Sequence, residues 1–127
     1  MTIYVFGNPD EVCDNRVFEV IKQFPQYSFK FIPPNADLPL KPDIIILDTV
    51  YGLPVPTLLT EKNIDQLISS PRTTAHDYDL GFQLKYLRKL GKLDKVNIIG
   101  IPPQGELDYN LIHSIFKKLV AHDIHGS

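Results

Sequence analysis

The stretch from Pro42 to Asp48 contains four consecutive aliphatic residues, Ile44–Leu47, with polar residues on either side. Such a run is typical of a strand that is buried on both faces in the middle of a parallel sheet. It ends at Asp48, and the turn-forming residues Gly52 and Pro54 follow. In open α/β sheets, ligands bind beyond the carboxyl ends of the strands. Asp48 is therefore a candidate site residue, with a turn-forming or helix-capping role as the alternative.

Apolar residues elsewhere in the chain alternate between strand-like and helix-like spacing. We expect strands over residues 2–6, 27–32, 56–60 and 96–101, a helical turn over 63–68, and helices over 17–24, 77–91 and from Asp108 onward. This order predicts an α/β fold with three αβα layers and a mostly parallel sheet, in a single domain spanning 1–127. Right-handed crossovers place the switch point of the sheet between the exits of the first and third strands.

Three polar residues could meet at that switch point. Asp14 lies in the loop after the first strand, Asp48 ends the third, and His76 stands just before the long helix at 77–91. Two carboxylates and an imidazole suit a divalent metal such as nickel or zinc, and they also suit an acid/base site that activates water. Taken singly, Asp14 is most simply an N-cap for the first helix, and a histidine such as His76 is more often a capping or surface residue. We expect the three groups to face one crevice.

Composition and charge exclude several classes of function. The formal net charge of −2 does not favour a nucleic-acid binder, and the single cysteine excludes an internal disulfide. No apolar run reaches membrane-spanning length, and the first residues lead into a strand without a signal-peptide pattern. We expect a cytoplasmic protein that neither binds nucleic acid nor inserts into a membrane. Gly7-Asn8-Pro9 lacks the later glycines of a dinucleotide fingerprint, which disfavours a nicotinamide or flavin cofactor.

Taken together, the motifs resemble the hydrogenase maturation endopeptidases, which trim the C-terminus of the large subunit of nickel–iron hydrogenases. The resemblance covers nearly the whole chain and rests on the order and spacing of its motifs. They are Gly7-Asn8-Pro9 after the first strand, Asp14 six residues after Asn8, Ile44–Asp48, Thr74-Ala75-His76 with Leu84 eight residues later, and Val96–Pro103 with its Gly-Ile-Pro-Pro ending.

The resemblance implies a five-stranded sheet in the order 2-1-3-5-4, with the fourth strand antiparallel. It also implies an aspartic-type endopeptidase in which Asp14, Asp48 and His76 are the catalytic and metal-contacting residues. The nickel would be carried by cysteine thiolates of the substrate, so the enzyme would have no cofactor of its own. Its partner would be a hydrogenase large-subunit precursor, and we take the chain to act as a monomer.

Some positions depart from the family pattern. Cys13 occupies the first acidic position of the family's acidic pair, and Asn15 replaces the glycine that follows it. The family's glycine-containing recognition loop corresponds here to residues 33–39, which contain no glycine. Two other functions therefore stay open. One is a degenerate response-regulator receiver domain. Phosphoryl chemistry in that family needs acidic residues at the end of the first strand and a lysine just before the final proline turn, and this chain has neither at those positions. The other is a catalytically inactive protease homologue that acts as a binding protein.

Overall fold

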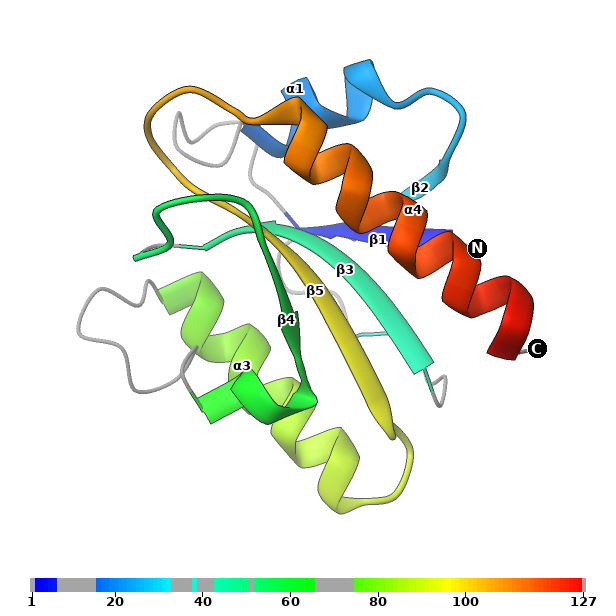
Figure 1. Ribbon diagram of the computed structural model, residues 1–127. Coiled ribbons are helices and arrows are strands. Elements are labelled where there is room, and N and C mark those ends of the chain that lie inside the picture. The colour runs from blue at the N-terminus through cyan, green and yellow to red at the C-terminus, as the bar shows by residue number, and fades with distance from the viewer. Residues whose placement is uncertain are drawn as a thin grey trace.

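Five strands form one sheet in the order β2-β1-β3-β5-β4 (Figure 1). The computed structural model describes residues 2–6, 16–32, 38, 43–50, 52–65 and 75–126, except the side chains of 75–79 and 122–126. The elements are β1 (Thr2–Phe6), α1 (Arg16–Gln23), β2 (Ser28–Ile32), β3 (Asp43–Thr49), β4 (Thr57–Thr60), the 3-10 turn η1 (Glu61–Asn63), α3 (Ala75–Lys89), β5 (Lys95–Ile101) and α4 (Tyr109–Gly126). Neighbouring strands are parallel except β4, which is antiparallel to β5. The predicted sheet order is confirmed.

Strand β3 occupies the centre of the sheet, and its side chains enter the core on both faces. Ile44 and Ile46 belong to one cluster of buried apolar residues, whereas Leu47 belongs to the other. Helix α3 covers the first face, and helices α1 and α4 cover the second (Figure 1). The successive aliphatic residues of β3 therefore point alternately to the two faces of the sheet, where they pack against helices on both sides. This confirms the predicted three-layer αβα architecture.

The ends of the helices follow local sequence signals. Gly91 adopts a left-handed φ of 73°, its N–H donates to the carbonyl of Arg88 at 3.1 Å, and the N–H of Lys92 donates to the carbonyl of Leu87 at 3.0 Å. This pair of bonds is a Schellman motif, which satisfies carbonyls at the end of α3. At the start of α4, the carboxylate of Asp108 accepts the N–H of Leu111 at 3.0 Å. Both predicted caps are confirmed.

Two boundaries differ from the prediction. Helix α3 begins at Ala75, so residue 76 lies within its first turn and not before it. The turn expected over 63–68 begins earlier, because the side chain of Thr60 caps η1 and Oδ1 of Asn63 accepts the N–H of Thr60 at 2.9 Å. Residues 66–68 lie outside the described part of the chain. Among the described residues, no helix is long and apolar enough to cross a membrane.

Phe116 of α4 offers a direct test of the core on the α1/α4 face. Its side chain is fully buried, and its ring centroid lies 4.9 Å from that of Phe24 and 4.8 Å from that of Tyr27. We predict that Phe116→Ala lowers the free energy of unfolding by about 3–5 kcal/mol, measured by urea denaturation. Tyr86→Ala on the exposed face of α3 is the control and should change it by about 0.5 kcal/mol or less. Equal losses in the two variants would contradict this core assignment.

Candidate functional site

The carboxyl end of β3 holds two buried polar side chains. Among the described residues, the buried polar side chains are those of Asp48, which has no exposed surface, and its neighbour Thr49. The hydroxyl of Thr49 has no hydrogen-bond partner within the described part of the chain. Withdrawing a carboxylate and a hydroxyl from water costs free energy, so a chain rarely buries them together for packing alone. Their position agrees with the ligand-binding edge of open α/β sheets.

Gly100 of β5 lies beside Asp48 in the sheet, because the two residues are paired in register. A Cβ atom added at Gly100 would lie 2.6 Å from Cδ1 of Leu53 and 3.4 Å from the carbonyl oxygen of Thr57. The side chain of Leu53 therefore closes over the glycine on the β5 side of Asp48. A larger residue at position 100 would displace this apolar wall.

The other two predicted site residues can be placed only in part. Asp14 lies outside the described residues, between β1 and α1 in the sequence. Residue 76 lies in the first turn of α3, and its side chain is not described. Asp48 has the same parity along β3 as Ile44 and Ile46, so it lies on the face of the sheet that α3 covers. The convergence of the three side chains stays a prediction. No cluster suited to a metal ion occurs among the described side chains.

An arginine links the start of α1 to the turn between β5 and α4. The guanidinium of Arg16, at the start of α1, donates a hydrogen bond to the carbonyl of Gly105. Gly105 has a φ of 88°, which a residue with a side chain rarely adopts, and it lies in the turn between β5 and α4. The bond therefore fixes the start of α1 against the segment that leads from β5 to α4. Sequence analysis missed the contact, since 89 residues separate the two partners.

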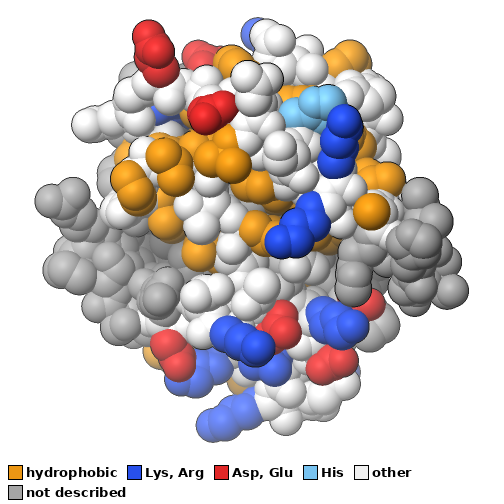
Figure 2. Space-filling view, in the orientation of Figure 1, with side chains coloured by type: hydrophobic (Ala, Val, Ile, Leu, Met, Phe, Trp, Pro, Cys, Tyr) orange, Lys and Arg blue, Asp and Glu red, His pale blue; other side chains and the backbone are white. Residues whose placement is uncertain are grey.

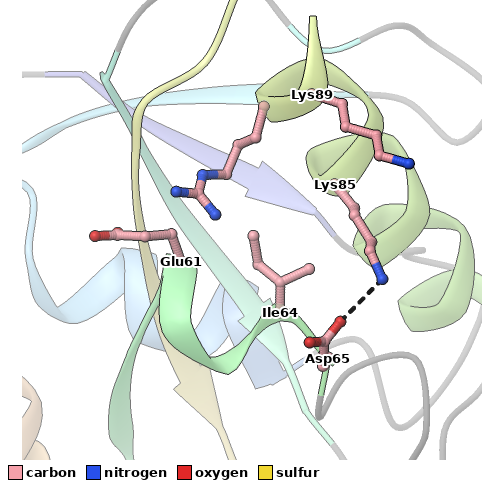
Figure 3. Close-up of a pocket in the computed structure, with 6 residues that line it drawn as sticks. Glu61, Ile64, Asp65, Lys85 and Lys89 are labelled. Atoms are coloured by element: carbon pink, nitrogen blue, oxygen red, sulfur yellow. Dashed lines mark hydrogen bonds and ion pairs between the residues drawn. The ribbon is translucent and has the colours of Figure 1, made fainter. Parts of the chain in front are cut away.

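A charged pocket of about 320 Å³ lies between η1 and α3, on the face of the sheet that α3 covers (Figure 3). Lys85 forms an ion pair with Asp65 at 3.3 Å, and the carboxylate of Glu61 accepts the N–H of Val96 at 3.1 Å. Lys89 also lines the pocket. The Lys85–Asp65 ion pair and the Glu61–Val96 hydrogen bond join the segment 61–65 to α3 and β5.

Burial raises the pKa of Glu61, but hydrogen bonds from the backbone N–H groups of Glu61 and Val96 oppose this effect, as do the positive charges of Arg88 and Lys62. The net result is a pKa below its ordinary value of 4.5. A carboxyl group with a lowered pKa in the folded state stabilises the fold above its unfolded pKa. This contribution is lost as the pH falls through the folded pKa.

We therefore predict a difference in acid sensitivity between the wild type and Glu61→Gln. The wild type should lose the Glu61 contribution as the pH is lowered from about 4.5 through the lowered value, whereas the variant has no such contribution to lose. Thermal unfolding between pH 3 and 7 measures this difference. A difference in melting temperature between the wild type and Glu61→Gln that stays constant from pH 3 to 7 would contradict the lowered pKa of Glu61.

Gly100→Ala tests the wall beside Asp48. We predict a loss of about 1–3 kcal/mol in the free energy of unfolding, because the new methyl group would overlap Leu53. The double variant Gly100→Ala/Leu53→Ala should be more stable than the sum of the single effects, because it removes the overlapping methyl group. Denaturant unfolding of the four proteins in a double-mutant cycle measures the coupling. If the two single effects add exactly in the double variant, the strain caused by Gly100→Ala does not come from an overlap with Leu53.

Two solved structures resemble this chain in fold. The first is hydrogenase maturating endopeptidase HybD from E. coli, with 22% identity and a TM-score of 0.55 over 83% of this chain and 76% of that chain. The second is an endopeptidase from Escherichia coli solved in solution, with 19% identity and a TM-score of 0.55 over 95% of this chain and 91% of that chain. No protein-family model and no curated protein matches the sequence. The fold implied by the motifs is confirmed: this chain shares it with two endopeptidases.

Proposed function

We propose that this protein is an endopeptidase that removes the C-terminal extension of a nickel-loaded hydrogenase large-subunit precursor. Asp14, Asp48 and His76 are the proposed catalytic and nickel-contacting residues. The observation that carries the proposal is the carboxylate of Asp48, fully buried at the carboxyl end of the central strand. The shared fold with two E. coli endopeptidases supports a protease role.

In this proposal the nickel belongs to the substrate. Nickel held by cysteine thiolates of the precursor retains coordination positions for oxygen and nitrogen ligands. Asp48 and His76 would fill some of these positions, which would align the peptide chain next to the metal for cleavage. The carboxylate of Asp48 is held by a strand that is paired with β5 through Thr49, so its position is defined before the precursor binds. A precursor without nickel would lack the group that these side chains recognise.

The sheet argues against the receiver-like alternative. Receiver domains have an all-parallel sheet in the order 2-1-3-4-5. Here β5 lies between β3 and β4, and β4 is antiparallel. The inactive-homologue alternative predicts the same fold, and it is separated from the endopeptidase only by the activity assay.

We predict that Asp48→Asn slows processing of the nickel-loaded precursor by roughly 100-fold or more, because a neutral amide is a poorer nickel ligand and misplaces the peptide. The nickel-free precursor should stay intact with the wild type. The assay is the gel shift of the precursor with and without nickel. Asp43→Asn, at the exposed start of the same strand, is the matched control and should process normally.

His76→Ala should also slow processing of the nickel-loaded precursor, because it removes the proposed nitrogen ligand of the nickel. Thermal unfolding of each variant separates loss of the site from loss of the fold. Cleavage of the nickel-free precursor, or full activity of Asp48→Asn, would contradict the proposed role of the site. Binding of the nickel-loaded precursor without any cleavage would instead identify an inactive homologue.

A further inference from the structure

A second groove lies on the opposite face of the sheet, between β4 and α4. It has a volume of about 330 Å³. Its apolar lining comes from Leu58 of β4 and Leu119 of α4, and Lys95 and Lys118 stand at its border. Figure 2 views this side of the molecule, where hydrophobic side chains gather near the centre and positively charged side chains border them. Neither the sequence motifs nor the proposed site uses this groove.

The charge of the groove is unbalanced. Lys95 and Lys118 are exposed, and neither forms an ion pair with any residue in the described part of the chain. The acid at the groove is Glu61, whose Oε2 accepts the N–H of Val96 and whose charge is offset by Arg88. Two unpaired ammonium groups beside an apolar floor fit a ligand that joins an apolar side chain to an anion.

The adjacent strand can bind a peptide backbone. β4 is the last strand in the sheet order, and no described strand lies beyond it. The N–H of Thr60 donates to the side chain of Asn63 and not to β5. Because backbone groups alternate sides along an antiparallel strand, the N–H and carbonyl of Leu58 also point away from β5. A short extended peptide can therefore form hydrogen bonds with Leu58.

The other edge strand differs in this respect. β2 has Lys30 in its middle, an exposed charge of the kind that discourages strand addition. β4 has the sequence Thr-Leu-Leu-Thr and no charge. Glu61 and Lys62 directly follow β4, and the two unpaired positive charges of the groove are those of Lys95 and Lys118. Within the described ranges no strand covers the edge of β4, and the two lysines favour a peptide whose anion lies at its end.

We propose that this groove binds the carboxy-terminal residue of an extended peptide, with its apolar side chain on Leu58 and Leu119 and its carboxylate between Lys95 and Lys118. This inference rests on the proposed function, and there the peptide is the C-terminal extension of the precursor. The extension is recognised at its far end while the bond to be cleaved lies near Asp48.

The sheet register sets the length of extension that can do this. Asp48 and Thr57 lie in one row, because both pair with Gly100. The groove is also lined by Asn97, three residues along β5, and by its partner Thr60. Three residues along a strand and two strand spacings across the sheet give a separation of roughly 14 Å. The peptide must also pass around the carboxyl edge, so it needs about six residues or more beyond the cleaved bond.

Peptide binding tests the groove without nickel or cleavage. The probe is a fluorescein-labelled peptide of about ten residues that ends in Thr-Val-Leu, made with a free C-terminal carboxylate and as the C-terminal amide. By fluorescence polarisation, the free acid should bind the full chain about tenfold more tightly than the amide, as expected for one charge-assisted contact. Lys118→Glu and Lys95→Glu should remove this preference. Lys117→Glu, an exposed neighbour on α4 outside the groove, is the charge-matched control and should keep it.

Equal binding of acid and amide, or an equal loss in Lys117→Glu, would overturn the proposal. So would a dimer in sedimentation equilibrium that Lys118→Glu dissociates, because the groove would then hold a second copy of the chain. A carboxylate preference without cleavage of any nickel-loaded precursor would support the groove and reject the proposed function. If Lys118→Glu still cleaves precursors with extensions longer than about six residues as fast as the wild type, the proposed function is supported and the groove proposal is rejected.

Discussion

The pairing of β3 with β5 is the interaction on which the rest of the structure depends. The two strands are parallel and in register from the Asp43–Lys95 pair to the Thr49–Ile101 pair, and the N–H of Val50 continues the pattern with a bond to the carbonyl of Ile101 at 2.9 Å. This pairing lies at the centre of the sheet, where backbone groups cannot be satisfied by water. Asp48 lies near the carboxyl end of this pairing, opposite Gly100, and the pairing keeps its carboxylate in a fixed, buried position.

Local sequence signals predicted the elements of the fold. The aliphatic run at Ile44–Leu47 predicted the central strand, and Asp108 and Gly91 predicted helix boundaries, because each signal acts within a few residues. The start of α3 was missed by two residues, since 75–79 has no apolar period to mark it. The antiparallel position of β4 came from the family resemblance, because Thr57–Thr60 alone does not specify its partner strand.

The candidate site was only partly predictable. The position of Asp48 followed from the end of an aliphatic run, and its burial is confirmed. The bond from Arg16 to Gly105 and the bond from Val96 to Glu61 join residues far apart in the sequence, so only the folded chain reveals them. The groove beside Lys118 likewise requires β4 and α4 to be placed first. The convergence of Asp14 and His76 on Asp48 stays a prediction.

In the two proposals, the two faces of the sheet contact different parts of the substrate. On the face covered by α3, Asp48 is the residue proposed to contact the metal that the substrate brings. On the other face, the groove between β4 and α4 suits the end of the chain that is to be removed. A precursor would then be accepted only when its metal is in place and its extension is long enough to reach the groove.

Nickel K-edge X-ray absorption of the nickel-loaded precursor, alone and in complex with this protein, tests the central claim most directly. The account predicts that complex formation adds oxygen or nitrogen ligands to the sulfur-coordinated nickel, and that Asp48→Asn and His76→Ala reduce this gain. A nickel spectrum that complex formation leaves unchanged would contradict the claim that Asp48 and His76 recognise the metal.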